Sequence, residues 1–320
     1  MIAYGPVPSR RLGQSLGINN IPAKVCSYDC LYCQIGPTVQ FRSHPRAFFA
    51  PEKIHAQVSR KVSRARAHQE SIDYLTFVSD GEPTLDLNLG RSILALKPLG
   101  IKLAVISNGS LLEDPNIRRS LGTADWVSLK VDVFQEKIWY RLNRPHESLR
   151  WNAVLDGMLD FARYFKGRLA TETMLVQGVN DDPAHLRQVA QFVSLLNPDT
   201  AYLAIPTRPP GREGICAPPE AVINEAYQIF DRKIAKVELL IGDEGDAFAF
   251  TGDVAEDVLS ITAVHPMAED ALRRLLGKAH ADWDVIQKMI EAGRIIKLRH
   301  NGKSFYMRRI KSRVQEHREG

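Results

Sequence analysis

The sequence predicts an α/β protein, with a partial (β/α)6 barrel of the TIM type over residues 1–250 and a small winged-helix domain over residues 251–320. Two observations predict the barrel: strand-like and helix-like segments alternate along the chain, and about six such units precede residue 235. Alternating strands and helices form right-handed βαβ units with a parallel sheet, and six units are too few to close an eight-stranded barrel. A third observation predicts the second domain, because the alternation ends near Gly252.

The strands of the barrel are predicted from short apolar runs rich in strand-forming residues. They cover residues 15–19, 73–79, 102–107, 126–131, 169–176, 201–205 and 236–241. The helices between them are predicted over residues 51–66, 88–99, 111–121, 148–165, 183–196 and 219–232. Ligands of parallel α/β folds bind at the carboxyl ends of the strands, so a site is expected in the segments that follow each strand.

The C-terminal domain is predicted from three short helices and a hairpin. The helices cover residues 254–263, 268–276 and 282–292, and the strands cover 295–300 and 304–310. The turn Asn301-Gly302 between the two strands is the strongest short signal for a hairpin. Three helices followed by a hairpin is the element order of a winged helix, a fold that commonly binds nucleic acid.

The composition is that of a globular protein. The chain has 320 residues, of which 44% are hydrophobic and 25% charged, so a sizeable core is expected. It has neither a leader-like segment nor a run of about 18 apolar residues, which predicts a cytoplasmic protein with no membrane partner. The net charge is +5, and the segment from Arg294 to Arg313 holds eight Lys or Arg residues without Asp or Glu. Such a segment favours a polyanionic partner, although solvated charge runs are also common.

Three of the four cysteines lie within eight residues, as Cys26, Cys30 and Cys33 in a C-x3-C-x2-C pattern after the first predicted barrel strand. In a reducing compartment, clustered cysteines indicate metal or redox chemistry rather than a disulfide. Three thiolates can ligate three irons of a cubane cluster and leave the fourth iron open to an exogenous amino and carboxylate group. Structural zinc is the alternative, but zinc normally takes four protein ligands, and Cys216 is distant in the sequence.

The cysteine pattern, with Tyr32 just before Cys33, resembles the signature of the radical S-adenosylmethionine superfamily, and the resemblance covers most of residues 13–240. It implies that Cys26, Cys30 and Cys33 bind a [4Fe–4S] cluster and act in catalysis, with S-adenosyl-L-methionine as the second cofactor. In that family the reduced cluster cleaves S-adenosylmethionine, and the resulting 5′-deoxyadenosyl radical abstracts hydrogen from the substrate. A low-potential electron donor is then an expected partner.

The resemblance also implies cofactor contacts at the ends of later strands. The segment Asp80-Gly81-Glu82 is similar to the family's Gly-Gly-Glu element, which engages the methionyl ammonium, although Asp80 replaces the first glycine. Ser107 and Asn108 are suited to the ribose hydroxyls. The other cofactor-binding residues that the resemblance implies are Tyr32, Lys130, Asp132 and Thr173. Each of these short motifs could also be an ordinary turn or a structural ion pair.

Three segments narrow the resemblance to the wyosine-synthase-like Fe–S oxidoreductases: residues 4–13, 33–36 and 79–84. The tRNA wyosine synthases carry additional upstream cysteines for a second cluster, whereas none precedes Cys26 here, so that reaction is disfavoured. The substrate is not identified; tRNA or another RNA, held by the basic C-terminal wing, is the preferred hypothesis. Arg10, Arg11 and Arg208 could bind an anionic substrate, although exposed arginines are usually solvated.

The alternative function is a regulator in which an Fe–S cluster senses redox state and the winged helix binds nucleic acid. The third predicted helix speaks against it, because Lys288 is its only basic residue and lies among Asp282, Asp284 and Glu291. An acidic helix is a poor reader of the DNA major groove.

Overall fold

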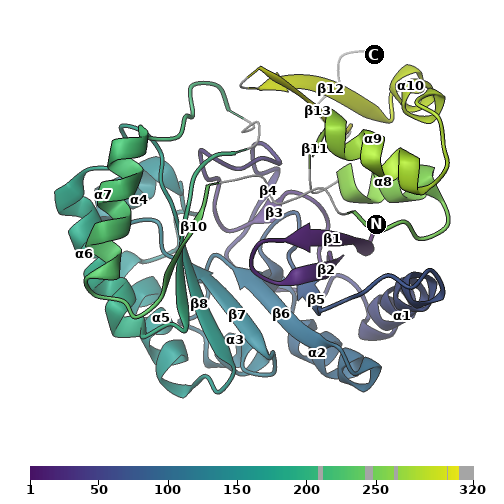
Figure 1. Ribbon diagram of the computed structural model, residues 1–320. Coiled ribbons are helices and arrows are strands. Elements are labelled where there is room, and N and C mark those ends of the chain that lie inside the picture. Colours follow the sequence, from purple (N-terminus) through teal and green to yellow (C-terminus); the bar gives the residue numbers. More distant parts are fainter. Residues whose placement is uncertain (208–211, 242–247, 263–265, 301, 310–320) are drawn as a thin grey trace, which may run out of the picture.

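The computed structural model describes residues 1–320 except 208–211, 242–247, 263–265, 301 and 310–320. The strands of its main sheet are β1 (Ala3–Ser9), β2 (Gly13–Ile18), β5 (Tyr74–Phe77), β6 (Lys102–Ser107), β7 (Trp126–Lys130), β8 (Arg168–Met174), β9 (Thr200–Ala204) and β10 (Val237–Leu240). They are ordered β1-β2-β5-β6-β7-β8-β9-β10. The strands from β2 to β10 are parallel to their neighbours. Within the described part of the chain β1 and β10 are not paired with each other, so the sheet is curled but open, which confirms the predicted partial barrel (Figure 1).

Helices cover the outer face of this sheet and follow the strands in order (Figure 1). They are α1 (Pro51–Ala67), α2 (Leu89–Leu96), α3 (Pro115–Leu121), α5 (Trp151–Tyr164), α6 (Pro183–Leu196) and α7 (Glu220–Asp231). The predicted helix over 111–121 begins only at Pro115, because the Asp114 side chain caps it by accepting from the Asn116 backbone N–H at 2.8 Å. No helix in the described part of the chain is long and apolar enough to cross a membrane.

Strand β1 is the main element that the sequence did not predict. It pairs antiparallel with β2, and its register shifts between Tyr4 and Val7. Pro6 and Pro8 cannot donate to a ladder, which argues against a central strand but is tolerated at the edge of a sheet. The short helix α4 (Glu136–Leu142) was also not predicted, since its seven residues are too few to establish a helical period.

The C-terminal module contains the predicted helices and hairpin. Its elements are α8 (Val254–Thr262), β11 (Met267–Ala268), α9 (Glu269–Lys278), α10 (Asp284–Glu291), β12 (Ile295–His300) and β13 (Lys303–Arg308). Strand β13 lies between β11 and β12 in a three-stranded sheet. Asn301 of the predicted turn lies outside the described residues, as do Lys311 and Arg313 of the basic segment. The identification of this module as a winged helix stays a prediction.

The module is fixed to the barrel by an apolar core and by a buried ion pair. Val7 of β1 belongs to the module's own hydrophobic cluster, with Val258 and Leu272 among its members. The Lys61 ammonium of α1 lies 3.1 Å from the Asp257 carboxylate of α8, and both side chains are buried. A buried pair whose members also bond to a shared hydroxyl, here Thr251, tolerates little relative movement.

Candidate active site

The cysteine loop follows β2 and lies over the carboxyl ends of the parallel strands. Cys26 is in the short strand β3 (Val25–Cys26), which pairs with β4 (Gln40–Phe41). The loop is tied to the segment after α4 by backbone bonds, from Asp29 N–H to the Asn143 carbonyl at 3.0 Å and from Leu31 N–H to the Leu142 carbonyl at 2.9 Å. All three thiols are half-buried and free of disulfides, and Cys216 is exposed. These backbone bonds hold the loop against the end of α4.

Amide and backbone N–H groups are directed at the sulfurs of this loop. Burial raises the pKa of Cys33, and hydrogen bonds from the backbone N–H groups of Ile35 and Gly36 counteract that effect. The Tyr28 backbone N–H and the Asn108 amide donate to Cys26 Sγ at 3.5 and 3.8 Å, and the Asn143 amide donates to Cys30 Sγ at 3.6 Å. Such donors favour thiolate over thiol and tune the potential of an Fe–S cluster. These hydrogen bonds thus stabilise the negatively charged thiolate form of the cysteines.

Burial opposes that charge as long as no cation is bound. Desolvation raises the pKa of Cys26 well above its usual value and the pKa of Cys30 to about 12. A bound metal must displace the thiol protons. Positive charge at the site would therefore stabilise the buried thiolates that water does not reach. No three His, Cys, Asp or Glu side chains among the described residues converge closely enough to share one metal ion. Three thiolates on one loop can each bind a separate iron atom of a cubane, so the donor set fits a [4Fe–4S] cluster.

A first polar network joins the ends of β5 and β6 to Cys26. Glu82 is buried, and its Oε1 accepts from the Thr84 hydroxyl at 2.6 Å and the Ser107 hydroxyl at 2.7 Å. Its Oε2 accepts from the Asn108 backbone N–H at 2.7 Å. Burial raises the pKa of Glu82, and these hydrogen bonds counteract the effect. The Asn108 amide, held in this way, also donates to Ser27 at 2.9 Å, beside Cys26.

Gly81 allows this network to approach the cysteine loop. A Cβ atom at this position would lie 1.9 Å from the carbonyl oxygen of Val25, so any side chain here would displace the strand that leads into Cys26. The Glu82 backbone N–H donates to the same carbonyl at 3.1 Å. The second glycine of the motif is therefore required by close backbone contact.

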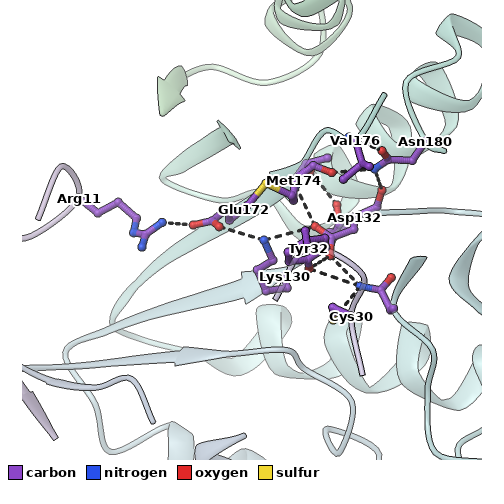
Figure 2. A network of polar contacts seen from close by, with 12 residues as sticks. Arg11, Cys30, Tyr32, Lys130, Asp132, Glu172, Met174, Val176 and Asn180 are labelled. Atoms are coloured by element: carbon purple, nitrogen blue, oxygen red, sulfur yellow. Dashed lines mark hydrogen bonds and ion pairs between the residues drawn. The ribbon is translucent and has the colours of Figure 1, made fainter. Parts of the chain in front are cut away.

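A second, charged network joins β7 and β8 to Cys30 (Figure 2). The Lys130 ammonium lies 2.9 Å from Glu172 and 3.4 Å from Asp132, and Arg11 pairs with Glu172 from the other side. Although burial opposes it, the two carboxylates raise the pKa of Lys130 above its usual value, so the amine is cationic. Arg11 is therefore already engaged with a carboxylate of the chain itself.

Asp132 is the centre of this second network. Its Oδ2 accepts from the Tyr32 hydroxyl and from the Asn143 amide, the latter at 2.8 Å, and its Oδ1 accepts from the Met174 backbone N–H at 2.8 Å. Asn143 thus connects Asp132 with Cys30 Sγ. The carboxylate holds Tyr32 and Asn143 in place around the cysteine loop.

The predicted site residues thus lie in two groups. Cys26, Gly81, Glu82, Ser107 and Asn108 belong to the first network, and Cys30, Tyr32, Lys130 and Asp132 to the second. The predicted residue Thr173 is buried, and its hydroxyl donates to the Val131 carbonyl at 2.7 Å.

Two members of these networks were not identified from the sequence. Asn143 and Ser27 contact residues far along the chain, such as Cys30 at a separation of 113 residues. Ser27 is one of the variable positions of the C-x3-C-x2-C pattern, and Asn143 lies outside the motifs named above. A polar residue in the turn after a short helix carries no local signal of such a contact.

Comparisons with known proteins agree with this geometry. Residues 20–190 match the model of the Radical SAM superfamily. A UPF0026 protein of Methanocaldococcus jannaschii is 45% identical over 314 residues, which are 98% of this chain and 97% of that protein. The solved structure of TYW1 with a lysine-pyruvate adduct bound superposes with a TM-score of 0.54 at 16% identity, over 70% of this chain and 76% of that one. A radical SAM methyltransferase from Sphaerobacter thermophilus gives 0.55 at 17% identity, over 71% and 66%.

Proposed function

Because this chain belongs to the radical SAM superfamily, we propose that Cys26, Cys30 and Cys33 hold its [4Fe–4S] cluster and that the enzyme modifies RNA. The chain is a radical SAM enzyme, with a [4Fe–4S] cluster and S-adenosyl-L-methionine as cofactors. When bound, the cluster supplies the electron that cleaves S-adenosylmethionine to a 5′-deoxyadenosyl radical, which can remove a hydrogen atom from a substrate. The observation that carries the assignment is the set of three free thiols on one loop, with N–H donors directed at Cys26 and Cys30.

The residues around the loop and at the strand ends beside it are assigned to S-adenosylmethionine: Tyr32, Gly81, Glu82, Ser107, Asn108, Lys130, Asp132 and Thr173. The hydrogen bonds that Glu82 and Asp132 accept within the chain also hold their neighbours in position. Tyr28 of the loop packs edge-to-face against Trp139 at a centroid distance of 5.8 Å, and Trp139 packs at a tilt against Trp151 at 5.1 Å, which places an apolar wall beside the loop.

RNA is the proposed substrate class because of the charge on the C-terminal module. On the hairpin and its flanks, Arg294, Arg299, Arg308 and Arg309 form no salt bridge with a described residue. Helix α10 carries Asp284 and Glu291, which would repel the phosphates that flank a DNA major groove. Unpaired arginines on a hairpin fit backbone binding to RNA, with residues 251–320 as the binding module.

The cleavage step is tested by anaerobic reconstitution with iron and sulfide, followed by dithionite and S-adenosylmethionine. The wild type is expected to form 5′-deoxyadenosine, and Cys30→Ala to lower that yield at least ~100-fold, since a cluster ligand and its charge are lost. Cys216→Ala is the matched control and is expected to stay within twofold, because Cys216 is exposed and outside both networks. Equal yields from Cys30→Ala and the wild type would contradict the assignment of the ligands.

The RNA assignment needs a separate readout. Nucleosides from total RNA of cells with and without the protein are compared by mass spectrometry, and one modified nucleoside is expected to depend on its presence. RNA affinity is expected to fall steeply with salt, since each phosphate contact releases a counterion. An unchanged nucleoside profile together with salt-independent binding would contradict RNA as the substrate.

A further inference from the structure

A cavity of about 480 Å³ lies where the C-terminal module meets the barrel, beside the strand ends already described. One wall comes from the barrel and includes Phe49 and Asp80; the other comes from the module and includes Arg294, Arg308 and Arg309. Its volume is within the ~300–1,000 Å³ typical of small-ligand sites. Its lining contains none of the three clustered cysteines and none of Glu82, Ser107, Asn108 or Lys130.

The three arginines are gathered by the base of the hairpin. Ile295 pairs with Arg308 across the ladder, and the Arg309 backbone N–H donates to the Arg294 carbonyl at 2.9 Å. This places the arginines at one end of the β12–β13 sheet. None of them forms a salt bridge or side-chain hydrogen bond with a described residue. Clustered guanidinium groups repel one another, so their arrangement favours an anion, and phosphate matches the fork of an arginine best.

Asp80 provides an acceptor on the opposite wall. The side chain is buried, with 7% of its surface exposed, and its Oδ1 has no hydrogen-bond partner among the described residues. Oδ2 makes one long bond, from the Asn19 amide at 3.4 Å. A buried carboxylate oxygen without a donor is costly, so a ligand hydroxyl or amine that bonds to it is stabilised.

Phe49 supplies an apolar surface between these polar walls. Its half-buried ring lines the cavity, and aromatic rings are the usual platform for a nucleobase. The three features match the parts of a nucleotide. The guanidinium groups match its phosphate, the carboxylate matches a ribose hydroxyl or base amine, and the aromatic ring matches the base. No simpler anion uses all three features.

The cavity adjoins the cysteine loop. Ala23, three residues before Cys26, lines it, and the Lys24 backbone N–H donates to the Asp80 carbonyl at 2.6 Å. In Figure 1 the hairpin lies on the same side of the molecule as β3 and β4.

We propose that this junction cavity binds a nucleotide, with its phosphate on Arg294, Arg308 and Arg309, a hydroxyl or amine on Asp80, and its base against Phe49. The proposal rests on the proposed function in one respect, that the nucleotide belongs to the substrate, either free or within RNA. The barrel and the module then form the substrate site jointly, and the module's rigid attachment holds the two walls together.

The test is calorimetric titration of the anaerobic, cluster-loaded protein at low salt with AMP, GMP, CMP and UMP. At least one is expected to bind at a single site, with adenosine and inorganic phosphate at least ~10-fold weaker, since each lacks one recognition element. Arg308→Gln is expected to weaken binding ~10-fold or more, and the more exposed Arg294→Gln ~3-fold, with melting curves to show that both variants fold. Arg163→Gln, exposed on α5 and outside the cavity, is the control and should stay within twofold.

Competition with a single-stranded RNA of about 20 nucleotides identifies the source of the ligand. Displacement of the bound mononucleotide supports a nucleotide within RNA, and simultaneous binding supports a free nucleotide. The proposal is overturned if no mononucleotide saturates a site, if inorganic phosphate binds equally well, or if Arg308→Gln and Arg163→Gln weaken binding equally. Formation of 5′-deoxyadenosine is measured in parallel, so loss of the radical function and loss of the nucleotide site are distinguished.

Discussion

Two carboxylates of one segment, Glu82 and Asp80, differ in how fully their oxygens are hydrogen-bonded. Both are buried, with 2% and 7% of their surfaces exposed. Glu82 faces the barrel, and each of its oxygens accepts hydrogen bonds from the chain, whereas Asp80 faces the domain junction and its Oδ1 accepts none from a described residue. A carboxylate whose bonds are satisfied positions its neighbours, while one left unsatisfied beside three arginines is available to a ligand. Glu82 at the barrel end thus holds the cysteine loop in position, whereas Asp80 at the junction has an oxygen available to a ligand.

The comparison requires that the junction between the barrel and the C-terminal module is rigid. Removal of the buried Lys61–Asp257 ion pair is the test with the largest expected effect. Lys61→Met leaves Asp257 buried without its cation and is expected to lower the free energy of unfolding by ~3–5 kcal/mol. Arg64→Met is the control: it breaks the Arg64–Glu256 pair, which joins the same two helices at 2.9 Å but is exposed, and should cost less than ~1 kcal/mol. Urea unfolding measures both. Equal losses would show that the junction is not held by its buried pair.

Asp80→Asn tests the unsatisfied side of the comparison. Burial raises the pKa of Asp80 to about 7, against the lowering effect of the Met1 amino group, the Asn19 amide and Arg308. A carboxyl whose folded pKa is raised favours the folded state at low pH, and that contribution is lost as the pH rises from about 4 to about 7. The asparagine variant avoids this loss, so its stability relative to the wild type is expected to increase by ~2–3 kcal/mol between pH 5 and pH 8.

Chemical denaturation at the two pH values, without nucleotide and in one cluster state, provides the measurement. The exposed Asp156→Asn is the matched control and should show no such trend. If the difference between Asp80→Asn and the wild type were the same at pH 5 and pH 8, Asp80 would not be the unsatisfied acid described above.

Asn143→Ala tests the barrel end, where the polar groups are hydrogen-bonded within the chain. The substitution removes the bond to Asp132 Oδ2 and the contact with Cys30 Sγ, and is expected to cost ~1–2 kcal/mol of stability. A positioning role also predicts a changed reduction potential of the cluster, because hydrogen bonds to the sulfurs tune it. Redox titration followed by electron paramagnetic resonance measures that shift, with the exposed Asn152→Ala as control. A destabilised protein with an unchanged potential would leave Asn143 with a purely structural role.

The sequence predicted the barrel well where one physical signal dominates. The apolar runs of β6 and β7 coincide with the predicted strands within one residue, because buried parallel strands are continuously hydrophobic. Strand β1 was missed because the two prolines that an edge tolerates also look like a loop. The C-x3-C-x2-C pattern is local, so the residues that point to a cluster are visible in the sequence.

The surroundings of the cysteines could not be predicted in the same way. The bonds of Asn143 to Cys30 and of Lys130 to Glu172 join residues 113 and 42 positions apart, and they exist only once the strands are ordered in the sheet. The junction cavity depends on how Asp80 faces the base of a hairpin more than 200 residues later. Composition and periodicity carry no information about such pairings, although the arginines themselves were visible as a basic segment.

The central claim is that Cys26, Cys30 and Cys33 hold a cubane whose fourth iron is open to S-adenosylmethionine. The most direct measurement is electron paramagnetic resonance of the reduced, reconstituted protein before and after that cofactor is added. We predict a [4Fe–4S]⁺ signal that changes on addition, and its loss when all three cysteines are replaced by alanine but not in Cys216→Ala. Zinc in place of iron, or a cluster signal that persists in the triple variant, would contradict the claim.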